Sequence, residues 1–328
     1  MLSLHGPEGS LAPDPGGAIP PDAVWLDLKD PSSEEAAAVE AATGLRIPSR
    51  EALAEVETSS RLRRVKAGLS VSTPMITFER SDSQLKPLGF LLSKDRLVTV
   101  RFHDLRAFDS AGKRIADGDG SVTPSGVFLV ILEELVDSLA DAPEDMGSDL
   151  DSLSTRIFDF DVRGVERRRL ESPPPRRRDL ALRRILRGIS NRGKVLGKIR
   201  ASLLGLERII PFVAAACDGI GLPDDTRFET IKRDIESLDE FETRLAENVQ
   251  FLLDAALGLI TIEQNNVFRV LTVVSVVGVP PTLIASIYGM NFKHMPELEW
   301  TLGYPYALGL ILFSAVAPMI YFRIRGWF

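Results

Sequence analysis

Cysteine and histidine are scarce in this sequence. Its 328 residues include one cysteine and three histidines. A single cysteine excludes a disulfide within the chain and fits a reducing compartment. These few nitrogen and sulfur side chains are not enough for a dedicated zinc or haem site, so we expect no bound cofactor. The first residues have neither a basic start nor an apolar core, so we also expect no signal peptide.

Charge is missing from two long stretches near the end of the sequence. Residues 270–290 and 302–322 contain no Asp, Glu, Lys, Arg or His, whereas the part before residue 264 is rich in charge. As a helix, each stretch would be about 31 Å long, close to the roughly 30 Å of a bilayer's hydrocarbon core. Two buried core helices are the alternative. We predict two membrane spans, over residues 270–291 and 302–322.

The flanking residues predict the orientation of these spans. All four tyrosines and two of the three tryptophans lie in the last 41 residues, clustered at the span ends as in interfacial belts. Arg269 precedes the first span, and Arg323 and Arg325 follow the second, whereas the loop over 292–301 carries charges of both signs. The positive-inside rule then places both termini, including the basic tail over 323–328, on the cytoplasmic side of an inner (cell) membrane.

The stretch before the first span lacks helix-breaking signals. From residue 224 to 266 there is no proline and one glycine, Gly258, and apolar residues recur at steps of three and four. We predict one helix from 224 to about 290, whose residues 224–269 form a cytoplasmic stalk. So long a helix needs partners along its apolar stripe, either other copies or neighbouring helices. The alternative is two helices with a break near Gly258.

The leading part of the chain predicts an α/β domain over residues 23–223, after a loose segment over 1–22 that is rich in Gly, Pro and Asp. Capping serines and alternating or β-branched residues distinguish short helices from strands. Helical periods then continue from 123 to about 220, interrupted by three prolines at 173–175. The expected early elements are helices over 32–43 and 49–62 and strands over 69–78, 88–94 and 96–102, the last two joined at Lys94 and Asp95.

Positive charge is concentrated in one segment of this domain. Residues 163–200 contain 14 Arg or Lys and three acidic residues. One interpretation is a solvated helical hairpin that pairs with acidic neighbours, and a second is contact with anionic lipid headgroups. Nucleic acid is not expected as a partner, because no aromatic or base-reading residues accompany the basic ones.

Hydroxyl side chains of the first span fall on one helical face. The Ser and Thr residues, together with Val279, are spaced by three and four, and the stripe continues back through Phe268 and Asn265. Helix–helix packing would explain this pattern. The functional interpretation is that the face lines a water-filled pore. The hydroxyl residues are Thr272, Ser275, Thr282 and Ser286.

Two features, one in the middle and one at the end of the span, suit a hydrated cation. Pro280 and Pro281 release the carbonyls of Val276 and Val277, which is tolerated at membrane depth where protein or water satisfies them. Asn291, which follows Gly289 closely, offers a neutral amide oxygen. A ring of such oxygens can hold Mg²⁺ through its water shell, because this ion gives up water reluctantly.

The end of the sequence resembles the CorA family of divalent-cation transporters. The resemblance is carried by Tyr288–Gly289–Met290–Asn291 followed by Met295–Pro296–Glu297–Leu298, by the string TVVSVVGVPPTLIASIYGMNF, by GYP after Trp300 and by the ending YFRIRGWF. It implies a funnel-shaped homopentamer with an α/β cytoplasmic domain, a very long stalk helix and two transmembrane helices. Five first spans would surround the pore, and the selectivity filter would be Gly289, Met290 and Asn291.

The resemblance also implies roles for other residues. Mg²⁺, and with it Co²⁺ or Ni²⁺, would pass as the substrate, and Mg²⁺ bound between cytoplasmic domains would close the channel. Glu297 would enrich cations at the entrance, and candidate regulatory carboxylates include Glu229 and Asp234. No nucleophile–base pair supports an enzyme. The residues expected to form the constriction and the inner pore are Phe268, Leu271, Val279, Thr282, Asn265 and Asp254.

Two alternative functions remain open, and the sequence departs from the usual CorA pattern at two places. Zinc-transporting relatives usually have GIN where this chain has GMN, and the stripe has no His or Cys for zinc. A membrane-anchored sensor that conducts nothing would not need the hydroxyl stripe or Asn291. Lys293 and His294 stand where family members often carry an acidic residue, which would weaken the attraction for cations. Phe268 replaces a common methionine, which would make the constriction bulkier and stiffer.

Overall fold

The chain forms two compact units, Met1–Leu253 and Asp254–Phe328. Helix α7 (Asp225–Tyr288) contributes to both units, so the first part of the predicted stalk packs with the α/β domain. The computed structural model describes residues 1–7, 9–11, 19–55, 57, 61–66, 68–79, 82–118, 122–166, 175–215, 225–291 and 295–327.

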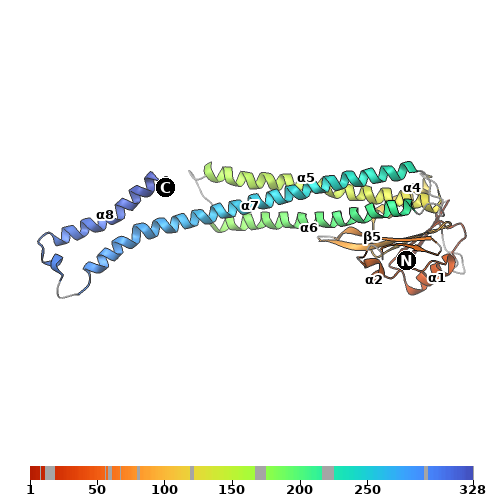
Figure 1. Cartoon of the computed structure of the whole chain (residues 1–328), viewed down its shortest axis with the longest axis horizontal. Coiled ribbons are helices and arrows are strands. Elements are labelled where there is room, and N and C mark those ends of the chain that lie inside the picture. Colours follow the sequence, from red (N-terminus) through yellow and green to blue (C-terminus); the bar gives the residue numbers. More distant parts are fainter. Residues whose placement is uncertain are drawn as a thin grey trace. The chain divides into compact units, whose positions relative to one another are not determined.

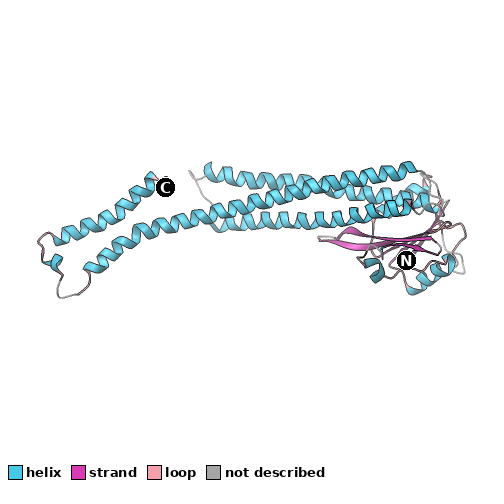
Figure 2. Cartoon of the chain, viewed as in Figure 1, coloured by secondary structure: helices cyan, strands magenta, loops and turns pink. Residues whose placement is uncertain are grey.

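A seven-stranded sheet is the base of the first unit (Figure 2). Its strand order is β2-β1-β3-β7-β6-β5-β4, with β3 and β7 parallel and the other described neighbours antiparallel. The strands are β1 (Leu2–Gly6), β2 (Gly9–Leu11), β3 (Trp25–Lys29), β4 (Leu62–Val65), β5 (Gly68–Glu79), β6 (Asp82–Leu92) and β7 (Leu97–Arg101).

The N-terminal residues correct one prediction. A loose segment over 1–22 is wrong for β1 and β2, which lie at one edge of the sheet. Leu2 and Leu4 alternate with polar residues, and they pair in register with Leu28 and Leu26 of β3. The alternation buries Leu4, so the domain begins well before residue 23. Residues 12–18 lie outside the described part.

Other early elements follow the prediction in part. β6 and β7 form the expected hairpin, in which the Ser93 N–H donates to the Arg96 carbonyl across Lys94 and Asp95. The first helix, α1 (Ser33–Thr43), has the expected capping serine, Ser32, in a complete capping box. The second predicted helix is shorter than expected. It ends at Ala54 as α2 (Arg50–Ala54), and Leu62 already belongs to β4.

Each face of the sheet is covered by a different set of helices. The short helices α1 and α2 lie on one face (Figure 1). The other face carries α4 (Arg106–Ala116), which the sequence did not predict, and the long helices α5 (Pro124–Glu166) and α6 (Pro175–Ala214). α6 begins at Pro175, the last of the three prolines at which the sequence predicted an interruption. The core on the α1 side comprises Leu4, Leu26, Leu28, Val39, Leu45, Leu53, Leu91, Val98 and Val100.

Ion pairs and close contacts fix the long helices. Arg227, at the start of α7, donates to Glu133 of α5 at 2.6 and 2.8 Å, and Arg114 of α4 reaches the same carboxylate at 3.1 Å. On α6, Arg192 pairs with Asp149 of α5 at 2.7 Å. The pair of Arg192 with Asp149 supports the interpretation of the basic segment as a helical hairpin with acidic neighbours. The side chains of residues 159–180 lie outside the described part.

The second unit contains the predicted spans. α7 continues without a break through Gly258 to Tyr288, so the alternative of two separate helices is wrong. A 3₁₀ turn, η3 (Pro296–Glu299), leads to α8 (Gly303–Ile324). Both helices are long and apolar enough to cross a membrane. Their most apolar windows are 0% and 6% buried within the chain, unlike the core helices of a soluble protein.

Candidate ion-conduction site

The predicted pore stripe lies on a single unbroken helix. Because α7 is continuous from Asp225 to Tyr288, residues spaced by three and four share one face. Phe268, Leu271 and Val279 are each at least 60% exposed in the single chain. Asn265 and the four hydroxyl residues of the stripe are exposed as well. The described residues of the same chain therefore leave the stripe uncovered, as expected of a surface that faces water or another copy.

Hydroxyl groups on this stripe have defined orientations. Thr272 donates its hydroxyl hydrogen to the Phe268 carbonyl, and Ser286 donates to the Thr282 carbonyl, each at 2.8 Å. Thr282 donates in the same way to the Gly278 carbonyl, also at 2.8 Å. A hydroxyl that donates within its helix still has oxygen lone pairs that can accept from water. These three side chains thus present acceptor oxygens along one face, which suits hydrated cations.

The two prolines remain inside the helix. Pro280 and Pro281 lack an N–H, so the carbonyls of Val276 and Val277 lose their helical donors. The hydroxyl of Thr282 bonds to Gly278 instead and does not replace either donor. Two further acceptor oxygens are therefore left for water or another copy at this level of the span.

The predicted filter lies at the C-terminal end of α7. The Gly289 N–H donates to the Ala285 carbonyl at 3.0 Å, and the Met290 N–H donates to the Ile287 carbonyl at 3.2 Å. Asn291 follows directly and is exposed. The last carbonyls of a helix carry a partial negative charge, which favours a cation beside them. The Asn291 amide oxygen and the last carbonyls of α7 therefore both attract a cation, although neither carries a formal charge.

Gly289 has little room for a side chain. A Cβ at this position would lie 3.2 Å from the Ala285 carbonyl oxygen, which is tighter than most real Cβ contacts.

Beyond the predicted filter, Met295 precedes η3, which begins at Pro296, and Trp300 packs edge-on against Tyr306 of α8 at 6.3 Å between ring centroids. Lys293 and His294 lie outside the described residues, as do the side chains of Glu297 and Leu298.

Comparison with known proteins identifies the family. The family described as CorA-like Mg²⁺ transporter protein matches residues 21–324. The chain belongs to this family. The magnesium transport protein CorA of Pasteurella multocida is 34% identical over 313 residues, which cover 93% of this chain and 92% of that protein. The protein of the same name from Salmonella typhimurium is 32% identical, with the same coverage.

A solved structure agrees with this CorA-like assignment at the level of the fold. The CorA magnesium transporter from Methanocaldococcus jannaschii superposes with a TM-score of 0.74 and 19% sequence identity. The match covers 100% of this chain and 98% of that one. An α/β domain, a long helix and two apolar helices near the end of the chain therefore form a CorA-type fold.

The predicted regulatory carboxylates do not form a metal site within one chain. Glu229, Asp234 and Asp254 are exposed along α7, and the described residues contain no group of three ligands that could hold a metal ion. Asp234 does lie in an acidic environment. The pKa of Asp137 on α5 is raised by burial and by its neighbours Glu134 and Asp234. A cation in this region would relieve the repulsion between them.

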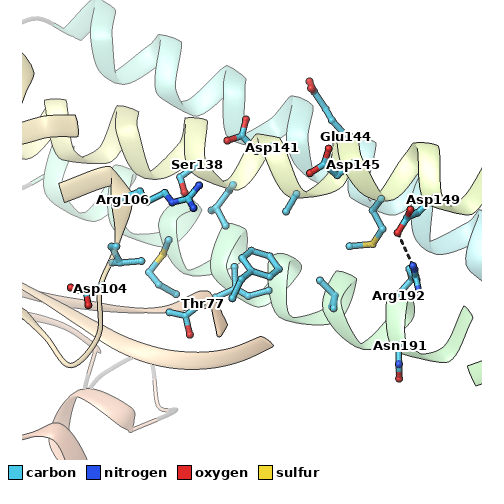
Figure 3. Close-up of a pocket in the computed structure, with 18 of the residues that line it drawn as sticks. Thr77, Asp104, Arg106, Ser138, Asp141, Glu144, Asp145, Asp149, Asn191 and Arg192 are labelled. Carbon is cyan, nitrogen blue, oxygen red and sulfur yellow. Dashed lines mark hydrogen bonds and ion pairs between the residues drawn. The ribbon is translucent and has the colours of Figure 1, made fainter. Parts of the chain in front are cut away.

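An acidic cavity in the first unit was not predicted from the sequence. Its volume is about 910 Å³, and it lies between the β5 end of the sheet and helices α5 and α6 (Figure 3). Carboxylates at four-residue spacing on α5 were the available signal, since Asp141, Asp145 and Asp149 share one helical face. Arg192 already neutralises Asp149. The cavity can concentrate cations, but the described residues do not form a metal-binding group there.

Proposed function

We propose that the chain conducts Mg²⁺ across the inner membrane as a homopentamer. Five copies of α7 surround the pore, five copies of α8 lie outside them, and both termini face the cytoplasm. The family assignment and the names of the curated relatives support Mg²⁺ as the ion. The two exposed apolar helices support a membrane location. On this proposal the chain has no enzymatic activity, and Mg²⁺ is its substrate and regulator.

The observation that carries the proposal is the exposed face of α7. It presents oriented hydroxyl oxygens and ends at Asn291, beside the negative end of the helix. Neutral oxygens can bind the water shell of Mg²⁺, whereas stripping that shell is costly. The filter therefore selects a hydrated divalent cation by its charge and its size. Gly289 and Met290 position Asn291, and the loop residues Met295, Pro296, Glu297 and Leu298 present ions to it.

Phe268 and Leu271 narrow the pore at the other end of the stripe. These apolar residues disfavour a continuous water column, so conduction stops when five of them approach the axis. Cytoplasmic Mg²⁺ favours this closed state by binding between neighbouring copies, where Glu229, Asp234 and Asp254 are the candidate ligands. Falling internal Mg²⁺ separates the copies and opens the pore. Wider parts of the pore are lined by Asn265, Thr272, Ser275, Val279, Thr282 and Ser286.

The proposed filter also predicts which other divalent ions can pass. Hydrated Co²⁺ and Ni²⁺ resemble hydrated Mg²⁺ in charge and size, so the same ring admits them. Zn²⁺ favours nitrogen and sulfur ligands, and the described stripe residues offer neither. There are two competing functions. A zinc transporter would carry Zn²⁺ in preference to Mg²⁺, and a non-conducting sensor would carry neither ion.

The test is uptake into liposomes that contain a Mg²⁺-sensitive dye. We expect uptake by the native chain, near loss with Asn291→Ala, and unchanged uptake with the control Asn266→Ala. Asn266 is the matched control because it is the same residue type on α7 but lies off the stripe. Equal signals from native and Asn291→Ala chains, or none from either, would refute the channel. Uptake of Zn²⁺ in preference to Mg²⁺ would favour the zinc transporter.

A further inference from the structure

The segment after α8 folds back onto its own helix. Gly326 has a φ of +69°, in the left-handed region that glycine tolerates best. Its N–H donates to the Arg323 carbonyl at 3.2 Å, and the Trp327 N–H donates to the Phe322 carbonyl at 3.0 Å. This pair of bonds is a Schellman motif, which ends a helix and reverses the chain. The reversal brings Trp327 back beside the last turn of α8.

Trp327 stacks against a buried ring. Its centroid lies 5.0 Å from that of Phe322, with 25° between the two planes. Phe322 is 6% exposed, although most of α8 is exposed in the single chain. The stack with Trp327 therefore accompanies the burial of Phe322 at that end of α8.

The same indole contacts the other span. The guanidinium carbon of Arg269, on α7, lies 6.0 Å from the Trp327 ring centroid, within the range of a cation–π interaction. Other aromatic contacts of this unit, Trp300 with Tyr306 and Tyr321 with Phe322, stay within α8 and its preceding loop. Trp327 thus joins α8 to α7 at the residue next to Phe268. We call Trp327, Phe322 and Arg269 the clamp.

We infer that Trp327 is a positioning residue for gating, which rests on the proposed channel function. The clamp ties the end of α8 to the turn of α7 that carries the predicted constriction at Phe268. When the pore opens, that turn must shift relative to α8, and the clamp opposes this shift. Loss of the clamp makes opening easier, so more Mg²⁺ on the side of the α/β domain is needed to close the channel.

The first test measures inhibition of uptake by Mg²⁺ on that side in liposomes. Trp327→Ala and Arg269→Gln each raise the half-inhibiting Mg²⁺ concentration about fivefold, the size expected from one cation–π contact. Trp327→Phe and Arg269→Lys keep it near the native value, because a ring and a cation remain. The double variant shifts no further than either single one, since both remove the same contact.

The matched control is Arg323→Gln. Arg323 carries the same charge at the same end of α8, but among the described residues it has no aromatic partner. We expect native inhibition from this variant. An equal shift from Arg323→Gln would show a simple charge effect and overturn the clamp, as would additive shifts in the double variant or a native response from Trp327→Ala.

A second measurement tests the clamp without transport. The chain has three tryptophans, so labelling with 5-fluorotryptophan gives three ¹⁹F NMR signals, and Trp327→Phe identifies the one from Trp327. Arg269→Gln should move that signal and leave those of Trp25 and Trp300 unchanged. An unmoved Trp327 signal would overturn the clamp even if the chain conducts. A shifted signal in a chain that conducts nothing would keep the contact and refute the proposed function instead.

Discussion

At the scale of single residues, a buried ion pair stabilises the α/β domain. Arg101 of β7 donates to both carboxylate oxygens of Asp27 on β3, at 2.7 to 3.2 Å, and Thr99 donates to the same carboxylate at 2.7 Å. The Arg101 guanidinium also lies over the Phe108 ring at 4.8 Å. These contacts link the two parallel strands to each other and to α4. The buried pair is stabilising because every charged atom in it has a hydrogen-bond partner.

Removing one charge of this pair should strongly destabilise the domain. We expect Asp27→Asn to lower the free energy of unfolding by about 3–5 kcal/mol, since Arg101 would keep a buried charge without its counterion. Urea unfolding of the detergent-solubilised chain, followed by circular dichroism, measures the loss. The control is Asp104→Asn, because Asp104 pairs with Lys29 at an exposed site. Its loss should stay below about 1 kcal/mol. Equal effects from the two variants would contradict this account.

His103 should make the stability of the domain depend on pH. Its pKa is lowered to about 4 by burial and by the nearby positive charges of Lys86 and Arg101. Among the described residues, neither ring nitrogen has a hydrogen-bond partner. The unfolded chain, with a His pKa near 6.5, takes up a proton that the folded chain excludes. Stability is therefore full above pH 6.5 and falls as the pH is lowered towards 4.

The variant His103→Gln isolates this contribution. Glutamine does not titrate, so the variant should lose stability less steeply than the native chain between pH 6.5 and 4, and both should have similar slopes above pH 7. Unfolding midpoints across this range supply the measurement. Parallel curves for the two chains would show that His103 does not set the dependence.

At the scale of elements, α6 packs very closely on the sheet. A Cβ added at Gly205 would lie 2.0 Å from the Thr73 hydroxyl oxygen and 3.1 Å from Pro74 of β5. The Ser202 hydroxyl, one turn away, accepts from the Ile76 N–H at 2.9 Å. Glycine therefore allows the helix to approach the strand closely enough for this bond to form.

Two alanine substitutions on α6 should have opposite effects. Gly205→Ala forces α6 away from β5 and should destabilise the domain by about 1–3 kcal/mol. Gly197→Ala should stabilise it by about 0.5–1 kcal/mol, because no described atom lies within 4 Å of the added Cβ and alanine favours a helix. Both values come from the same unfolding experiment. Destabilisation of similar size at both positions would refute the close-approach argument.

Elements with strong periodicity could be predicted from the sequence, and short ones could not. The 3.6-residue period and the absence of proline between residues 224 and 266 were sufficient to predict α7, which continues through Pro280 and Pro281. The strands β1, β2, β3 and β4 were missed because each is only three to five residues long, too short for a periodic pattern to be distinct. α4 was missed because it starts without a side-chain cap.

The candidate site shows the same division. The stripe on α7 could be predicted because it depends on spacing along one helix, and the structure keeps its residues on one exposed face. The acidic cavity could not, because β5, α5 and α6 bring its residues together only after folding. The regulatory carboxylates remain a prediction, since the described part of one chain does not assemble them.

At the scale of the whole molecule, the proposed function depends on several copies. One chain exposes its stripe and leaves its span windows almost unburied, so a closed pore requires partners around an axis. Closed rotational symmetry would place every Asn291 in one ring and every Phe268 in another. The proposed selectivity therefore comes from a ring of Asn291 side chains, which one chain cannot form.

The most direct test is the reversal potential of currents through the purified chain in a planar bilayer. With a Mg²⁺ gradient and equal monovalent salt on both sides, we predict a reversal potential that follows the Mg²⁺ gradient in the native chain. The Mg²⁺ current should disappear with Asn291→Ala. A reversal potential that stays at zero, or a Mg²⁺ current that survives the loss of Asn291, would contradict selection of a hydrated divalent cation at the end of α7.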